Sequence, residues 1–284
     1  MLRAVIPVDE LSFVCGLLSH RSEQQEHECD IAVRIRGFKM TPSCAASMSL
    51  VVAVSNKDSI VLAADTICLI GSPEAHYLYD DDFSKIFPLR NPKFGVGVAG
   101  SSTVEQFVEI GQSSNTFNEL VGFIRGAVSK RYDEKQLDYE MTFLFCGFGA
   151  DDKPFIETLS FDGSCRTGRL EEVSSKIGKA AIGICKHGAL YIIHSFHNLE
   201  MTTEQLGFLA YFALRETILD DERTRGPVEL AVLRPHSPMT LYSPEQKRAL
   251  EAAYSERKER VRNALTEPVQ GLCTRTNGSR PSQS

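Results

Sequence analysis

The chain has 284 residues, of which 42% are hydrophobic and 24% are charged, and its formal net charge is −6. This length suffices for one large domain with a substantial core, or for two small domains. The acidic balance argues against a nucleic-acid surface, which needs a concentrated basic face. No run of residues reaches the roughly 18–20 apolar positions that a membrane-spanning helix requires. We therefore expect neither nucleic acid nor a membrane as a partner.

The N-terminal segment lacks the features of a secretory signal. Asp9 and Glu10 interrupt its apolar run, and no small-residue cleavage site follows. The eight cysteines are irregularly spaced and form no CxxC pair, so we expect neither a metal nor a cofactor. These features favour a cytoplasmic protein whose cysteines are ordinary buried thiols.

Composition divides the chain into four segments. Residues 1–48 do not have the pattern of a folded unit, and we interpret them as an N-terminal extension, a propeptide, or a stretch upstream of a start at Met48. Residues 49–235 carry the patterns of a folded domain, and residues 236–265 contain a C-terminal helix. Residues 266–284 contain Gly, Ser and Pro and are predicted to be disordered.

The domain begins with strands. Residues 49–55 and 59–65 are apolar, β-rich runs separated by a turn, which predicts a buried hairpin. Residues 66–82 are predicted to form a long loop that ends in three acids. Two further strands are predicted at residues 85–88 and 94–99, joined by a turn.

Helices follow, and then strands resume. Residues 101–111 are predicted to form a helix with Glu105 placed for a capping box, and residues 116–132 a second helix. The later predicted elements are strands at 141–147, 155–160, 179–183 and 189–193, a helix at 203–219, a strand at 228–233 and an amphipathic helix at 244–265. Blocks of strands therefore alternate with blocks of helices. This order favours an α+β fold with antiparallel sheets covered by helices.

Four stretches carry a family resemblance. The segment SLVVAVSNKDSIVLAAD, from Ser49 to Asp65, resembles the opening of a proteasome β subunit or of its bacterial relatives, without a gap. DDFSKIF, which contains Lys85, FGVGVAG, which ends at Gly100, and the acidic turn at residues 220–226 before the last strand match the family in the same order. The resemblance spans about residues 49–235. It implies a four-layer αββα sandwich of two antiparallel sheets, the fold of the N-terminal-nucleophile (Ntn) hydrolases.

The resemblance implies that Ser49, Asp65 and Lys85 form the reactive group. A free N-terminal serine supplies a hydroxyl nucleophile and its own α-amine as the base, and an α-amine has a pKa near 8. Asp65 would keep Lys85 charged and oriented, and the charge of Lys85 would lower the pKa of neighbouring groups.

The remaining implied site residues surround this group. The backbone N–H of Gly100 would stabilise an oxyanion, and Asp221 and Thr224 would form hydrogen bonds around the N-terminus. Three features depart from the family pattern. The nucleophile is serine instead of threonine, Met48 precedes it instead of glycine, and the stretch GICK at residues 183–186 lacks the family's serine hydroxyl unless Cys185 replaces it.

The implied function is peptide-bond hydrolysis by Ser49, exposed by removal of residues 1–48, in a threonine-protease-like enzyme. Its implied substrate is a peptide or an unfolded protein, and its implied assembly is a homo-oligomeric ring. Whether an ATP-dependent unfoldase acts with it stays open. Each site residue also has an ordinary structural interpretation, as a strand-initiating serine, a turn acid or a solvated lysine. Two alternatives therefore remain: a non-catalytic ring subunit of the same fold, and an amidohydrolase for a small amide.

Overall fold

The computed structural model describes residues 49–66, 68–70, 78–80, 83–91, 93–100, 114–133, 141–162, 165–173, 178–220 and 226–266. The described residues up to Ala252 belong to one compact unit, and the part of the chain from Ala253 onward is described by itself. The helix predicted at residues 101–111 lies outside the described residues, as do the N-terminal segment and the tail.

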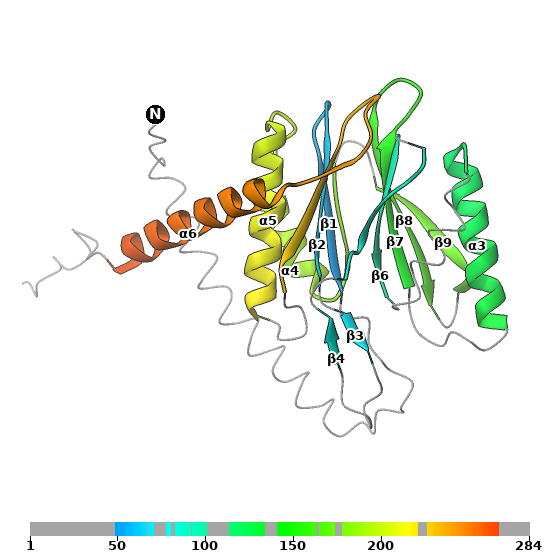
Figure 1. The fold of residues 1–284 in the computed structure, drawn as a ribbon, viewed down its shortest axis with the longest axis horizontal. Helices are drawn as coiled ribbons and strands as arrows, with labels where there is room; N and C mark the ends of the chain where they lie inside the picture. Colours follow the sequence, from blue (N-terminus) through cyan, green and yellow to red (C-terminus); the bar gives the residue numbers. More distant parts are fainter. Residues whose placement is uncertain are drawn as a thin grey trace, which may run out of the picture. The chain divides into compact units, whose positions relative to one another are not determined.

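The first sheet contains the strands that open the domain (Figure 1). Its strand order is β10-β1-β2-β11-β12, and every neighbouring pair is antiparallel. Its strands are β1 (Leu50–Ser55), β2 (Ile60–Asp65), β10 (Lys179–Gly183), β11 (Val228–Leu233) and β12 (Thr240–Leu241). The three central strands are buried along their whole length, which explains why they have continuous apolar runs instead of alternation.

The second sheet has the strand order β5-β6-β7-β8-β9, again antiparallel throughout. Its strands are β5 (Ile86–Pro88), β6 (Phe94–Ala99), β7 (Met141–Phe148), β8 (Pro154–Asp162) and β9 (Cys165–Val173). A separate two-stranded ribbon is formed by β3 (Cys68–Ile70) and β4 (Leu78–Asp80).

Helices cover the outer face of each sheet (Figure 1). On the second sheet, α3 (Phe117–Asp133) buries Leu120, Ile124 and Val128 in one apolar cluster with side chains of β6, β7 and β8. On the first sheet lie α4 (Lys186–Phe196) and α5 (Thr203–Asp220). A capping box begins α5, because the Thr202 hydroxyl accepts the Gln205 N–H at 3.3 Å while the Gln205 side chain accepts the Thr202 N–H at 2.8 Å.

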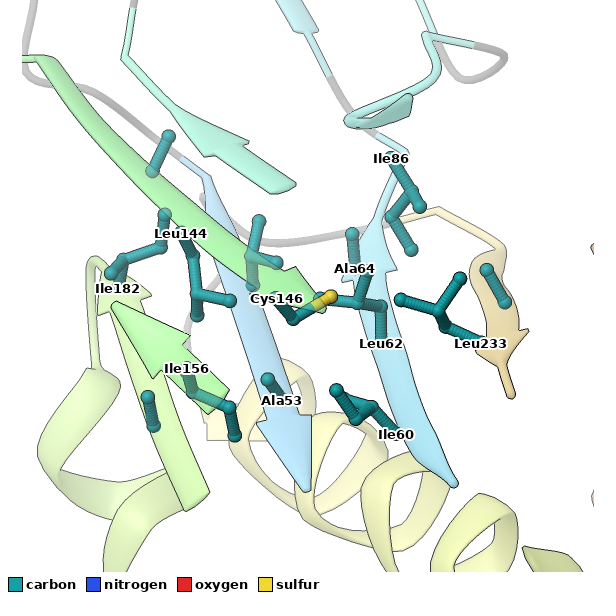
Figure 2. Packing of buried hydrophobic residues seen from close by; sticks show 14 of the residues in the cluster. Ala53, Ile60, Leu62, Ala64, Ile86, Leu144, Cys146, Ile156, Ile182 and Leu233 are labelled. Atoms are coloured by element: carbon teal, nitrogen blue, oxygen red, sulfur yellow. The ribbon is translucent and has the colours of Figure 1, made fainter. Parts of the chain in front are cut away.

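A second apolar cluster fills the space between the sheets. Figure 2 shows Leu62 and Ala64 of β2 beside Cys146 of β7, with Ile156 and Ile182 in the same layer. Burial raises the pKa of the Cys146 thiol to about 12, so this thiol acts as an apolar packing group. The layer order is helix, sheet, sheet, helix, which confirms the predicted four-layer α+β fold.

Most of the predicted elements are confirmed, and three differ. The predicted loop at residues 66–82 contains the β3–β4 ribbon. The strand predicted at residues 189–193 is instead part of helix α4. The edge strand β9 was not predicted, because its sequence, CRTGRLEEV, is mostly polar and lacks an apolar run.

The predicted C-terminal helix is present as α6 (Pro244–Thr266). Within the described residues, its surface carries short-range ion pairs such as Arg248 with Glu245 at 3.0 Å and Arg262 with Glu259 at 2.8 Å. None of the helices in the described ranges combines the length and the hydropathy that a membrane span demands.

Candidate active site

The centre of the site is an ion pair between the two sheets. Asp65 is the last residue of β2, and Lys85 immediately precedes β5 of the other sheet. The Lys85 ammonium donates to Asp65 Oδ2 at 2.7 Å, and the two side chains are only 2% and 0% exposed. Two buried charges of opposite sign at this distance hold each other in place, since separating them would leave each charge without compensation. The structure therefore brings together two of the three predicted reactive residues.

Asp65 also connects this pair to the residue next to the nucleophile. Its second oxygen, Oδ1, accepts the backbone N–H of Leu50 at 2.7 Å. Ser49 directly precedes Leu50 and is buried at the start of β1. The carboxylate of Asp65 thus fixes the start of β1 with one oxygen and the lysine with the other.

The carbonyl group of Ser49 is fixed from the opposite side by the glycine turn. It accepts the backbone N–H of Ile184 at 2.9 Å. Gly183 has a φ of +97°, and a side chain at this position would overlap the Ser49 carbonyl oxygen. Glycine is therefore required here, both for its backbone conformation and for the close approach of β1.

Gly100 lies beside this turn. It directly follows β6 and has a φ of +143°. Ala99, the last residue of β6, has its Cβ 3.3 Å from the place that a Cβ at Gly183 would take. On the same strand, the Val98 N–H donates to the Lys85 carbonyl at 2.9 Å. The end of β6 therefore borders both the lysine segment and the turn that contacts Ser49.

The electrostatics of the pair follow from its burial. Burial raises the pKa of the Asp65 carboxyl above its ordinary value, while the Lys85 ammonium and the Leu50 N–H offset part of that rise. A carboxylate that is this deeply buried persists because it has a cation and a backbone donor as partners. The structural interpretation of Lys85 as a solvated lysine is therefore wrong.

Two predicted site residues and one candidate substitute remain. Asp221 and Thr224 lie outside the described residues. Cys185 is half-buried and adopts a left-handed conformation, with φ of 58°, directly before α4. Its position next to Ile184 places its backbone near Ser49.

One residue at this site, Glu229 on β11, was not predicted from the sequence. Its buried carboxylate accepts the Lys85 backbone N–H at 3.3 Å, and the Ser84 hydroxyl lies within hydrogen-bond distance of both its oxygens, at 2.9 and 3.0 Å. The signal for it was present, because a single acid inside the apolar strand VELAVL needs buried partners. Nearby, the Thr66 hydroxyl donates to the Pro227 carbonyl at 3.1 Å, which joins the end of β2 to the start of β11.

In the ranges that the structure describes, no group of three or more His, Cys, Asp or Glu side chains has an arrangement suited to a metal ion. The chemistry that this arrangement offers is electrostatic. A buried cation binds the carboxylate at the end of β2, and the same carboxylate accepts the backbone N–H of the residue after Ser49. Such a charge favours the neutral form of a nearby amine and stabilises negative charge that develops close to it.

Comparison with known proteins identifies the family of the chain. A family profile described as a proteasome subunit matches residues 49–233, which begins at Ser49 and ends with β11. A search of curated protein sequences found no match.

Two of the solved structures that share the fold are described as Anbu proteins. The structure described as Anbu (Gly-1) mutant from Hyphomicrobium sp. strain MC1 has 18% identity and a TM-score of 0.59, covering 78% of this chain and 99% of that one. The structure described as Anbu (ancestral beta-subunit) from Yersinia bercovieri has 14% identity and a TM-score of 0.61, with the same shares covered. At these identities the two structures show the fold alone. Because the family profile spans more than half of the sequence, this chain belongs to the proteasome subunit family.

Proposed function

We propose that this protein is a peptidase whose nucleophile is Ser49, exposed as the N-terminal residue when residues 1–48 are removed. The observation that carries the proposal is the bridge made by Asp65. One of its oxygens binds the Lys85 ammonium at 2.7 Å, and the other accepts the N–H of the residue after Ser49 at 2.7 Å. A buried ion pair gives little net stability, so a role in chemistry accounts for its presence better than a role in folding.

The reaction would proceed in two steps. The Ser49 hydroxyl oxygen attacks the carbonyl carbon of the substrate peptide bond, and its proton passes to the free α-amine of Ser49. The tetrahedral oxyanion collapses, the C–N bond breaks, and the leaving amine takes the proton from the α-ammonium. A water molecule then attacks the resulting ester and releases the second product, which restores the serine hydroxyl.

The other groups would support these steps without forming bonds to the substrate. The Lys85 ammonium would keep the α-amine neutral, and Asp65 would hold Lys85. The backbone N–H of Gly100 would donate to the oxyanion, an interaction worth about 3–4 kcal/mol in comparable sites. Asp221 and Thr224 would form hydrogen bonds to the new N-terminus.

Membership of the family also supports an assembly and a substrate class. Proteasome-like proteins form oligomeric rings, and we propose a homo-oligomeric ring for this chain with peptides or unfolded proteins as substrates. The folded unit would then be residues 49–235, followed by the C-terminal helix and a disordered tail. An ATP-dependent unfoldase is a partner that such a ring could use, and the cytoplasm is the compartment in which it would work.

The second candidate is a non-catalytic ring subunit of the same fold. One observation favours it: the turn that contacts Ser49 carries Ile184 and Cys185 where the family has a serine hydroxyl. A small-amide hydrolase with the same nucleophile is a third possibility, and it would share the chemistry of the first.

Labelling with a peptide epoxyketone separates a catalytic Ser49 from a non-catalytic subunit, and peptide hydrolysis separates a peptidase from a small-amide hydrolase. This electrophile forms its ring adduct only with a hydroxyl and an adjacent free amine, so we expect one adduct, located by peptide mass spectrometry on Ser49. Ser49→Ala should abolish both the adduct and peptide hydrolysis, whereas Ser49→Thr should retain them. Peptide hydrolysis that survives Ser49→Ala would overturn the proposal.

A further inference from the structure

Glu229 is a buried carboxylate that the proposed reaction does not use. It is the second residue of strand β11 in the first sheet, in a run of otherwise apolar residues, and is 8% exposed. The single hydrogen of the Ser84 hydroxyl is shared between the two oxygens of Glu229, at 3.0 and 2.9 Å, and the Ile86 carbonyl at 3.0 Å, and the Lys85 backbone N–H donates to Oε2 at 3.3 Å. Burial of an acid is costly unless its hydrogen bonds are made, so these partners account for its presence at this position.

Its location places it beside the ion pair. In the register of β11 with β2, Glu229 lies opposite Ala64, and Val228 lies opposite Asp65. Its hydrogen-bond partners, by contrast, belong to the segment that enters β5 of the second sheet. Two carboxylates on adjacent strands of the first sheet therefore bind the same short segment of the second.

Lys85 is consequently fixed at three points. Its ammonium binds Asp65 at 2.7 Å, its carbonyl accepts the Val98 N–H at 2.9 Å, and its N–H donates to Glu229. A lysine side chain has four rotatable bonds and loses considerable entropy when it is fixed, so an anchored backbone reduces the freedom that remains. The contact to Asp65 alone would leave the main chain of this segment free to shift.

We infer that Glu229 is a positioning residue for Lys85: it anchors the main chain of the lysine segment, so that the ammonium is held against Asp65 and close to Ser49. The effect of Glu229 on catalysis rests on the proposed function. The contact by which Glu229 anchors the lysine segment belongs to the fold and does not depend on that function. Glu229 does not contact the reacting atoms, and it acts through Lys85.

The first test measures reaction with the epoxyketone. Glu229→Met keeps the length of the side chain but removes both acceptor oxygens, so that neither the Ser84 hydroxyl nor the Lys85 N–H has an acceptor at this position. We expect the maximal rate of Ser49 labelling to fall about 10- to 100-fold, as small misplacements of catalytic groups do. The epoxyketone concentration that gives half of the maximal labelling rate should change less than about twofold. Ser84→Ala should lower the maximal labelling rate in the same way. Ser84→Thr keeps the hydroxyl and should label Ser49 at a rate near that of the parent protein.

The second test does not depend on catalysis. Brief acetylation of the native protein with an N-hydroxysuccinimide ester should spare Lys85, which is 2% exposed, and modify the exposed Lys93. In Glu229→Met we expect the ratio of Lys85 to Lys93 labelling to rise about fivefold or more, because a released segment exposes its ammonium. Val232→Ala, on the same strand, serves as the matched control for lost stability, and in this variant the ratio should stay near that of the parent.

The outcomes separate the two proposals. If the parent protein forms no epoxyketone adduct, the proposed function fails, and the acetylation ratio still tests the anchoring. If the ratio of Lys85 to Lys93 labelling in Glu229→Met is no higher than in Val232→Ala, Glu229 is structural only and the inference is overturned. An increased Lys85 ratio with an unchanged rate of Ser49 labelling also overturns it. Should Glu229→Met fail to fold, the Ser84→Ala and Ser84→Thr pair decides by the same two measurements.

Discussion

At the scale of single residues, Asp65 is the side chain on which the site depends. Its carboxylate joins the start of β1 to the lysine of the other sheet through two contacts of 2.7 Å. Breaking a buried pair by removing one partner leaves an uncompensated charge, whereas replacing both partners by neutral groups often restores stability. Stability and activity should therefore respond differently to single and double substitutions here.

Lys85→Met should lower the free energy of unfolding by about 3–5 kcal/mol, because it leaves the Asp65 carboxylate buried without a cation. Adding Asp65→Asn should restore most of that loss, because the amide oxygen still accepts the Leu50 N–H. Hydrolysis should remain at least about 100-fold reduced in both variants. Denaturant unfolding and peptide hydrolysis measure the two effects. A double variant as unstable as Lys85→Met would show that the buried charge is not the cause.

The stability of Lys85→Met should also depend on pH in a defined direction. Burial raises the pKa of Asp65, and removal of the Lys85 ammonium takes away the largest influence that lowers it. An acid whose pKa is raised by folding stabilises the fold below its unfolded pKa, and this contribution is lost as the pH rises through the folded value. We expect thermal unfolding to show a smaller loss of stability in Lys85→Met, relative to the parent protein, at pH 5 than at pH 8. A deficit independent of pH would contradict this explanation.

At the scale of elements, the contact between β1 and the glycine turn fixes Ser49. Gly183→Ala should cost more than the about 1–3 kcal/mol expected for strained backbone alone, since the new Cβ would overlap the Ser49 carbonyl. Gly126→Ala is the matched control, because Gly126 is exposed on α3 and a Cβ there meets nothing within 4 Å. The control should gain about 0.5–1 kcal/mol. Equal effects of the two substitutions on unfolding would refute the role of this turn.

His197 connects the end of α4 to the far end of β1. Its Nε2 lies 2.8 Å from the Ser55 carbonyl oxygen, and burial lowers the pKa of the ring, with a further lowering by Lys179. A histidine whose pKa is lowered by folding contributes stability above its unfolded pKa, near 6.5, and loses it as the pH falls through the folded value. The thermal midpoint should therefore fall between pH 7.5 and pH 5.5 by more in the parent than in His197→Gln. If the thermal midpoint falls equally in the parent and in His197→Gln, groups other than His197 determine its pH dependence.

The sequence predicted elements best where both faces of a strand are buried. β1, β2 and β11 have uninterrupted apolar runs, which indicate their boundaries. The edge strand β9 has no such run, and in α4 the short apolar run ALYII fits either a strand or a helix. Length and flanking residues decide only weakly between these two structures.

The site residues were predictable to the extent that the family motif contains them. Asp65 and Lys85 lie in two such stretches, and the structure pairs them. Glu229 is outside any motif, and its partners are about 145 residues earlier in the chain, so only the fold reveals the contact.

At the scale of the whole molecule, we predict a closed homo-oligomer. Native mass spectrometry of the processed protein should give a species whose mass is a whole-number multiple of one chain, because closed rings have a fixed number of subunits. Ser49→Ala should assemble to the same mass, since Ser49 is buried within the fold. A protein that stays monomeric at micromolar concentration would contradict the ring and leave the chemistry of Ser49 to be judged by itself.

The most direct test of the central claim is the N-terminus of the mature protein. The account requires a free amine on Ser49, because the same residue supplies the nucleophile and its base. Intact-mass measurement combined with N-terminal sequencing of the protein purified from its native source should identify Ser49 as the first residue. An active protein whose chain still begins at Met1 would contradict the account.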